Sequence, residues 1–186
     1  MINFKNLSKA LKHTRSSQVY WFRTEKYSYL LTGYWGIRTT KRLHVEKGIF
    51  PTLINLFQDI PEISKGYQVT FKGVELMKEE QIKTFIELIE NVPETEIKYT
   101  GLFNKRNNMD EDVILKSSSN YIFINKIYMD FIDGVEFGTK LFGKGPCNAI
   151  YAQNGEEIAM ILPVRYSDIP EYLKSIQGED DVSGIK

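Results

Sequence analysis

The chain has 186 residues, of which 42% are hydrophobic and 26% are charged, with a single cysteine, Cys147. This length and composition allow one domain or two small ones, and a lone cysteine excludes an internal disulfide. No apolar run approaches the roughly 20 residues that span a bilayer, and the first residues lack the pattern of a signal peptide. We therefore expect a cytoplasmic protein without a membrane partner.

Charge is unevenly distributed, although Lys+Arg and Asp+Glu each number 24. Residues 1–50 carry ten Lys or Arg and two acids, a net charge of +8. Residues 51–100 and residues 151–186 each have a net charge of −4. The basic first quarter predicts an anionic partner, and the competing interpretation is ordinary surface lysine that keeps the protein soluble.

The first half of the chain predicts two short helices with a strand between them. Residues 7–14 have apolar side chains at helical spacing, with Asn6 as the cap. Pro51 fits the first turn of a second helix, residues 51–59. The period-two run of residues 27–37 predicts a strand, with one face formed by Tyr27, Tyr29, Leu31, Gly33, Trp35 and Ile37.

The second half predicts one long helix, one short helix and several strands. Apolar residues at i, i+3, i+4 and i+7 predict a helix over residues 78–90. The apolar run 121–124 predicts a strand covered on both faces, followed by a helix at 126–132, and the polar segment 104–112 predicts a loop. Alternation predicts further strands within 97–103, 135–141 and 158–164.

Strand-like segments precede each predicted helix, so a strand-then-helix unit occurs four times. Short connections favour antiparallel sheets, and the mixture indicates an α+β fold with short helices on one face of each sheet. We expect two small domains, at residues 1–70 and 71–166. Residues 167–186 are expected to form a C-terminal extension that starts as a short helix and is partly disordered, with a frayed end from residue 178.

Catalytic chemistry has little support in the sequence. His13 and His44 have no Cys or Asp neighbour at the spacing of zinc ligands. Residues 143–145 lack the rest of a phosphate-binding loop, and the acids at 110–112 lack the spacing of a calcium loop. We therefore expect a binding protein that is not an enzyme and that has no metal or cofactor.

Several short segments have residue patterns that can be compared with those of a known family. Residues 121–132 combine a strand with a short helix, and Gly145-Pro146 leads into a strand at Ala149-Ile150. Residues 157–166 end in an apolar-Pro-apolar-Arg-apolar pattern, and residues 30–38 end in Trp-Gly-Ile-Arg. The three segments between residues 121 and 166 resemble, in this order, the bacterial sliding clamp, the processivity factor of replicative DNA polymerase. Residues 30–38 resemble its T-D-G-x-R turn, with Gly36 and Arg38 matching and Trp35 in place of the acid.

The resemblance implies two clamp-like domains, each built from two strand–helix units, and a ring that would be a trimer of this chain. It also implies sequence-independent DNA binding through cations on the helices. The acidic helix at 78–90 departs from this pattern, because a ring lined by acids repels DNA. The DNA-binding residues carried over, together with neighbouring cations, are Lys5, Lys9, Lys12, Arg15, Arg23, Arg38, Lys41 and Arg42.

Sliding clamps also bind short linear peptides of replication and repair proteins in an apolar pocket, which the resemblance carries over by position. The chain continues beyond the closing strand to residue 186. We expect Ile169, Tyr172, Leu173 and Ile176 to fold back over the pocket or to dock on a neighbour. The predicted pocket residues are Arg38, Thr39, Leu162, Pro163, Val164 and Arg165.

The expected function is a sliding-clamp-like accessory of DNA replication, encoded by a phage or mobile element given its small size. Two alternatives stay open. One is a protein-interaction module that keeps the clamp fold without encircling DNA, which the acidic helix favours. The other is a monomeric binder of single-stranded nucleic acid, in which bases stack on strand aromatics, namely Tyr20, Trp21, Phe22, Tyr27, Tyr29, Tyr34 and Trp35.

Overall fold

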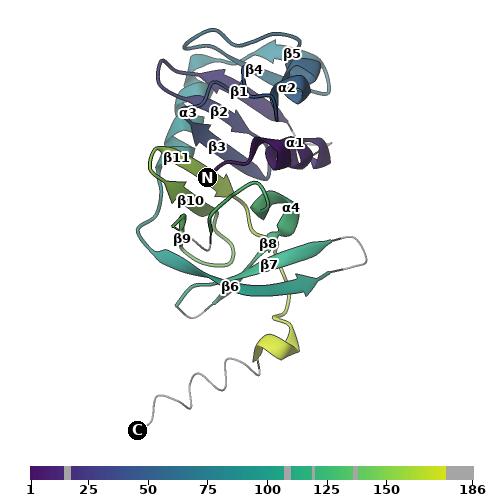
Figure 1. The fold of residues 1–186 in the computed structure, drawn as a ribbon, viewed down its shortest axis with the longest axis vertical. Helices are drawn as coiled ribbons and strands as arrows, with labels where there is room; N and C mark the ends of the chain where they lie inside the picture. The colour runs from purple at the N-terminus through teal and green to yellow at the C-terminus, as the bar shows by residue number, and fades with distance from the viewer. Residues whose placement is uncertain (15–17, 107–109, 119, 136–137, 175–186) are drawn as a thin grey trace.

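The computed structural model describes residues 1–14, 18–106, 110–118, 120–135 and 138–174. Figure 1 labels the helices and strands found in these residues. The helices are α1 (Phe4–His13), α2 (Phe50–Phe57), α3 (Glu79–Glu90) and α4 (Lys126–Met129). The strands are β1 (Val19–Arg23), β2 (Ser28–Leu31), β3 (Trp35–Thr39), β4 (Gly66–Thr70), β5 (Gly73–Leu76), β6 (Glu96–Lys105), β7 (Glu111–Lys116), β8 (Tyr121–Asn125), β9 (Lys140–Gly143), β10 (Ile150–Asn154) and β11 (Glu157–Ile161).

These strands form one sheet, which runs the length of the molecule in the order β5-β4-β1-β2-β3-β11-β10-β9-β6-β7-β8 (Figure 1). Neighbouring strands are antiparallel, from the β4–β5 hairpin to the β7–β8 hairpin. Helices cover the sheet, so the predicted α+β class with antiparallel strands and short helices is confirmed, but the helices lie on both faces and not on one as predicted.

The middle of the sheet is built from two similar units. One is α1 followed by β1, β2 and β3, and the other is α4 followed by β9, β10 and β11. Strands β3 and β11 pair antiparallel at the centre, with Trp35 opposite Ile161. The order β1-β2-β3-β11-β10-β9 therefore reads the same from either unit, which gives a pseudo-twofold relation about the β3–β11 pair.

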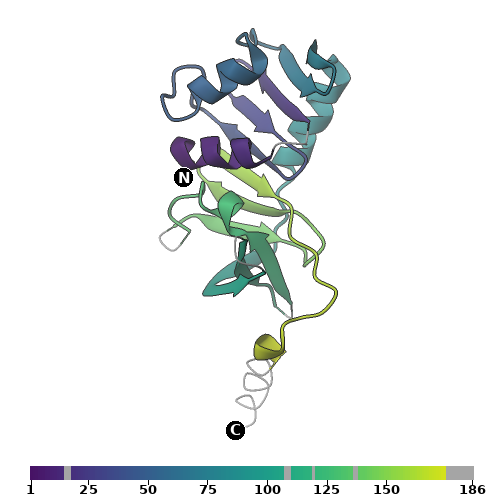
Figure 2. The ribbon, with the colours of Figure 1, turned by 90° about the vertical axis from the view of Figure 1, so that its right-hand side faces the viewer.

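Helices α1, α2 and α4 pack on one face of the sheet, and α3 packs on the other (Figure 2). The first core contains Leu11 of α1, Leu53 of α2 and Met129 of α4, all buried. The second core contains Ile82 and Ile89 of α3. Both sets follow the helical spacing of apolar residues, since that spacing directs one side of each helix toward the sheet.

The two units are also joined through α1. Its cap is Asn3 and not Asn6 as predicted, because Asn3 Oδ1 accepts a hydrogen bond from the backbone N–H of Asn6 at 3.1 Å. The helix therefore begins earlier than expected, and its strand-like lead shrinks to one bridge between Ile2 and Ile132. The Asn6 side chain instead donates to the Asp130 carbonyl at 2.9 Å, beyond the end of α4.

The alternating run at residues 27–37 is a hairpin rather than one strand. The hydroxyl oxygen of Thr32 accepts hydrogen bonds from the backbone N–H groups of Tyr34 and Trp35, which stabilises a turn between β2 and β3. The turn changes the phase of the alternation, so that Leu31 faces the second core and Trp35 the first. The prediction of a single face was wrong, because period two continues unbroken through the turn.

Other boundaries also shift. The predicted loop at 104–112 is wrong at both ends, where residues of β6 and β7 pair with each other. The predicted strand at 158–164 ends at Ile161, and Val164 forms only a bridge with Phe123. The predicted strand within 135–141 begins only at Lys140, as β9, and its Phe137 lies outside the described residues.

The predicted domain boundary at residues 70 and 71 falls inside the β4–β5 hairpin, whose strands pair from Tyr67–Leu76 to Thr70–Gly73. The division at this point stays a prediction. The start of the predicted extension is present as a short helical turn at 171–174. Ile176 and the end predicted to be frayed lie outside the described residues.

Candidate nucleic-acid interface

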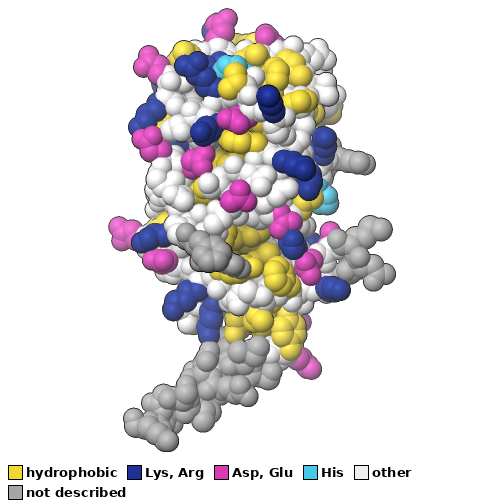
Figure 3. Space-filling model, in the orientation of Figure 1, with side chains coloured by type: hydrophobic (Ala, Val, Ile, Leu, Met, Phe, Trp, Pro, Cys, Tyr) yellow, Lys and Arg dark blue, Asp and Glu magenta, His cyan; other side chains and the backbone are white. Residues whose placement is uncertain are grey.

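Three lysines form a stripe along the exposed side of α1. Lys5, Lys9 and Lys12 are spaced at i, i+4 and i+7 and are all exposed, while Leu7 and Leu11 are buried on the opposite side. The stripe is about 10 Å long at 1.5 Å per residue. Helix α1 contains no acidic residue, and none of the three lysines forms an ion pair within the described part of the chain. Figure 3 shows Lys and Arg side chains together over this helix.

The loop after β3 reaches the start of α1 at Gly48 and carries further exposed cations. Its backbone at Gly48 approaches so closely that a Cβ there would lie 2.9 Å from the Lys5 nitrogen, which explains the glycine. At its other end, the Lys41 N–H donates to the Thr39 hydroxyl at 3.1 Å. We define the basic surface as the exposed cations of α1 and this loop: Lys5, Lys9, Lys12, Lys41, Arg42 and Lys47.

The acidic helix lies on the face opposite the basic surface. Glu79, Glu80 and Glu87 of α3 are exposed, and Lys83 forms an ion pair with Glu79 at 2.8 Å. Because the sheet separates α3 from α1, an anion on the α1 side does not face these carboxylates (Figure 2). The acidic residues of α3 are the feature in which the sequence differs from the clamp pattern. Because they lie on the opposite face of the sheet, they do not change the charge of the α1 face.

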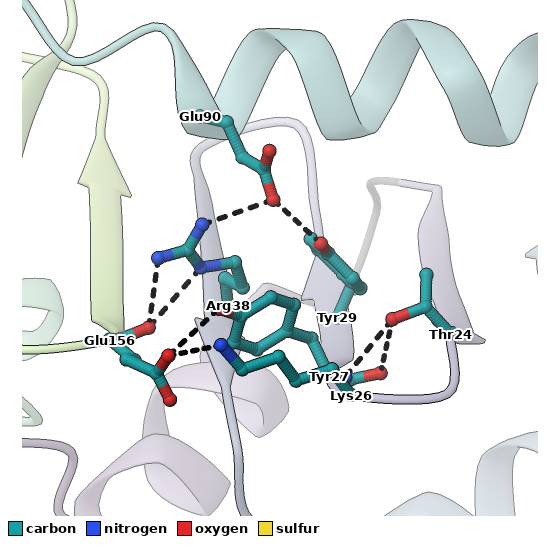
Figure 4. A network of polar contacts seen from close by, with 7 residues as sticks. All are labelled: Thr24, Lys26, Tyr27, Tyr29, Arg38, Glu90 and Glu156. Carbon is teal, nitrogen blue, oxygen red and sulfur yellow. Dashed lines mark hydrogen bonds and ion pairs between the residues drawn. The ribbon is translucent and has the colours of Figure 1, made fainter.

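Arg38 belongs to a network that ties α3 to the sheet (Figure 4). Its Nη1 lies 3.0 Å from Glu90 Oε1, and its Nε and Nη2 donate to the Glu156 carbonyl at 3.2 and 3.0 Å. The guanidinium also lies over the ring of Tyr27, 4.4 Å from its centroid. Burial, and then the hydrogen bond to Glu90, raise the pKa of the Tyr29 phenol. With its side chain 12% exposed, Arg38 makes its contacts within the fold, and its assignment to DNA stays a prediction.

The other predicted DNA-binding residues fall into three groups. Lys5, Lys9, Lys12, Lys41 and Arg42 belong to the basic surface. Arg23 is half-buried in β1, and its Nη1 donates to the Pro61 carbonyl at 3.0 Å. Arg15 lies outside the described residues.

The two walls of the predicted peptide pocket lie at the two ends of β11, and the pocket stays a prediction. Arg38 pairs with Ile158 near the start of β11, whereas Leu162 follows the end of β11 and donates its N–H to the Tyr34 carbonyl. At about 3.3 Å per residue, the strand between the two walls is about 13 Å long. Thr39 is buried and donates its hydroxyl proton to Glu157 at 2.7 Å. The other residues of the set continue beyond Leu162: Pro163, Val164 and Arg165.

The strand aromatics do not form a base-stacking platform. Trp21, Phe22, Tyr29 and Trp35 are buried, with at most 1% of their surface exposed. Tyr34 is exposed, but its ring stacks on Tyr128 at 6.0 Å between centroids. The predicted stacking surface is therefore wrong for four of its members, because strand aromatics at these positions fill the two cores.

The residues that the structure describes show few other features that could support metal binding or catalysis. No group of three or more His, Cys, Asp or Glu side chains in these ranges could hold a metal ion. Cys147 is free and exposed, and burial lowers the pKa of the His44 imidazole. No helix in the same ranges is long and apolar enough to cross a membrane.

The C-terminal extension folds back onto the chain, as was one of the two expectations for it, but the surface that it covers was not predicted. The predicted solvated acids at 110–112 include Asp112, which is fully buried and accepts a hydrogen bond from the Tyr166 hydroxyl. Leu173, in the predicted extension, is also fully buried, against the face of β7 and β8 that lies away from α4. The apolar spacing of residues 164–173 was the available signal, but it did not say which surface these residues cover.

No protein-family model matches the sequence, and no curated protein matches it. Among solved structures, the chain is similar to a putative DNA polymerase III beta subunit from Eubacterium rectale, with 12% identity, a TM-score of 0.40, and coverage of 88% of this chain and 63% of that one.

A second solved structure of the same kind is similar to the chain. It is the DNA polymerase III beta chain from Streptococcus pneumoniae, with 12% identity, a TM-score of 0.37, and coverage of 93% of this chain and 66% of that one. The chain thus spans just under two thirds of the length of either structure.

Proposed function

We propose that this protein is a sliding-clamp-like accessory of DNA replication that binds duplex DNA without sequence specificity through the basic surface. The observation that carries the proposal is the segregation of charge. The exposed side of α1 has three lysines and no acid, whereas the acidic helix α3 lies across the sheet.

Phosphate contacts explain why this surface suits DNA. Duplex DNA carries one charge per ~1.7 Å of axis, so the about 10 Å length of the lysine stripe spans about six phosphates on the two strands. Unpaired ammonium groups replace condensed counterions at such a backbone, and the release of those ions drives binding. Nothing in this mechanism reads bases, which agrees with the burial of the strand aromatics.

The first prediction concerns the lysine stripe. Replacing Lys5, Lys9 and Lys12 together with Gln should weaken binding of duplex DNA at low salt. The dependence of log K on log salt should become shallower by up to about 2.7, at about 0.9 for each phosphate that a lysine no longer neutralises. Fluorescence anisotropy with a labelled duplex over a series of salt concentrations measures both quantities.

A matched triple variant provides the control. Lys83, Lys98 and Lys140 are exposed, and the buried neighbours Ile97 and Leu141 place the last two on the face away from α1. Changing these three to Gln alters net charge by the same amount and should leave the salt dependence almost unchanged. Equal weakening by both triples, or no binding by the unmodified chain at low salt, would contradict the proposal.

Assembly into a ring is part of the proposal. The sheet has two outer strands, β5 and β8, through which copies could associate, and a ring of two-domain chains would be a trimer. Light scattering coupled to gel filtration should then give three times the chain mass of 21.6 kDa. A single-chain mass at high protein concentration would rule out the ring and leave a DNA-binding monomer.

We further propose that the protein acts with replication or repair proteins that carry short linear motifs, and that it is encoded by a phage or mobile element. The pseudo-twofold pair of strand–helix units supports the clamp-like part of this proposal. A protein-interaction module without DNA encirclement remains the alternative, and the exposed carboxylates of α3 favour it.

A further inference from the structure

Helices α1 and α2 lie next to each other on one face of the sheet, and a cavity of about 440 Å³ lies between them (Figure 2). The hydroxyl groups of Ser8 and Thr52 are 2.6 Å apart and join the two helices beside the cavity. Its volume falls within the range of about 300–1,000 Å³ that is usual for sites that bind small molecules. The cavity is therefore large enough for a guest of several rings.

The inside of the cavity is apolar. The hydroxyl groups that line it already have partners within the fold, since Thr14 donates to the Ala10 carbonyl at 2.7 Å and Thr52 pairs with Ser8. A guest meets no polar group there that it would leave unsatisfied, which suits a flat ring with apolar faces. The apolar lining comes from α1, α2, β1 and β4, through Leu11, Leu56, Val19 and Val69.

Two exposed side chains at the mouth of the cavity can bind polar groups. Lys12 is both a lining residue and the last lysine of the stripe, and it forms no ion pair within the described part of the chain. The Asn55 amide is also without a hydrogen bond in the described residues, and it offers both a donor and an acceptor. A second cavity, beside α4, is lined instead by Asp130 and Asp133. Of these two cavities, the one between α1 and α2 complements a phosphate group.

We propose that this cavity binds the base of an unpaired nucleotide in DNA whose backbone lies on the basic surface. The inference rests on the proposed function and adds the kind of DNA that the surface prefers. Lys12 contacts a phosphate, the base enters between α1 and α2, and Asn55 bonds an edge of the base. Because the Asn55 amide can present its donor or its acceptor, it suits any of the four bases, and the binding remains without sequence specificity.

Base pairing decides which DNA can use the cavity. A paired base has to leave its partner and its stack before it can enter a protein pocket, and this cost is smallest for a base that is already unpaired. The cations of the stripe contact the backbone in either case. We therefore expect the protein to prefer a duplex with one unpaired nucleotide to the fully paired duplex of the same sequence.

The experiment compares the affinity of the full-length chain for these two labelled duplexes, measured by fluorescence anisotropy at low salt. We expect the duplex with the unpaired nucleotide to bind at least about fivefold more tightly, as is usual when one base gains a protein contact. When the unpaired base is a fluorescent aminopurine, whose emission is quenched by stacking, the emission should rise on binding.

Two substitutions test whether the cavity is responsible for the preference. Val69→Phe fills the cavity from β4 and should lower the preference to less than about twofold, while Asn55→Ala should reduce it by about half. Val74→Phe is the matched control, because Val74 pairs with Val69 across the β4–β5 hairpin but does not line the cavity. It should leave the preference unchanged. Circular dichroism establishes that Val69→Phe is folded, and the exposed Asn55 serves if it is not.

Three outcomes would overturn the proposal. The first is equal affinity of the unmodified chain for the two duplexes. The second is a preference that Val69→Phe and Asn55→Ala both retain, which would assign it to the greater flexibility of the DNA. The third is a change of oligomer mass in Val69→Phe, which would assign the cavity to a second copy of the chain. Binding of the fully paired duplex tests the basic surface separately, so a missing preference with that binding intact leaves the function proposed above in place.

Discussion

Replacing Trp35 with alanine should lower the free energy of unfolding by about 3–5 kcal/mol, the range for removing a large aromatic side chain from a core. Trp35 is fully buried at the start of β3, directly opposite Ile161 at the end of β11, in the strand pair that joins the two units. Its ring lies 5.4 Å from that of Phe131, which follows α4, and its Nε1 donates to the Thr14 hydroxyl at the end of α1 at 3.3 Å. One side chain therefore contacts residues of both units, and urea unfolding measures the effect of removing it.

Two phenylalanine variants separate packing from hydrogen bonding at this position. Trp21 is also fully buried, but its Nε1 has no hydrogen-bond partner in the described residues. Trp35→Phe removes a hydrogen bond, whereas Trp21→Phe removes an unsatisfied N–H group. We therefore expect Trp35→Phe to be about 1 kcal/mol more destabilising than Trp21→Phe. A cost below about 1 kcal/mol for Trp35→Ala would contradict a packed junction between the units.

The helices were the most predictable part of this fold. Leu7, Ala10 and Leu11 are buried on α1 as their spacing predicts, and all four predicted helices are present within a few residues of the expected bounds. Periodicity works for helices because the signal is local, since residues three and four positions apart share a face. It could not give the side of the sheet, so the position of α3 opposite the other helices came only from the structure.

The strands were predicted less well, because alternation does not reveal turns. The run at residues 27–37 keeps period two across the Thr32 turn, although the two strands that it joins present their aromatics to different cores. The sequence also did not predict which strands pair with each other. Strands β3 and β11 are separated by more than a hundred residues in sequence, and nothing in either segment specifies the other.

In the candidate site, too, features that depend on local spacing could be predicted and features that depend on distant residues could not. The lysine stripe of α1 follows from local spacing, so Lys5, Lys9 and Lys12 could be found in the sequence. Arg38 was assigned to DNA because its partners, Glu90 and Glu156, are distant in sequence and could not be foreseen. The buried acceptor for Tyr166 was hidden for the same reason, since a run of acids resembles a solvated loop until a partner from the C-terminal segment is placed on it.

The second large effect is expected at Gly66, where alanine should destabilise the protein by about 3 kcal/mol, at the upper end of the usual range for overpacking. Gly66 is the first residue of β4 and pairs with Phe22 of β1. A Cβ at this position would lie 2.5 Å from Phe22 Cβ and 2.9 Å from Met77 Sδ. The Phe22 Cβ is fixed to the backbone and cannot rotate away, so the two strands must move apart. Chemical unfolding measures the cost.

Gly143 supplies a matched control for this prediction. It is also a buried strand glycine, but a Cβ there would meet its nearest neighbour, Ile150 Cγ2, at 3.4 Å, which is an ordinary contact. Because alanine orders a strand better than glycine does, Gly143→Ala should change stability by less than about 1 kcal/mol. Similar costs for the two variants would show that the close approach of β1 and β4 is not what requires glycine. A large cost at Gly66 alone would mean that this contact fixes β4, and with it β5 and Met77 just before α3, against the rest of the sheet.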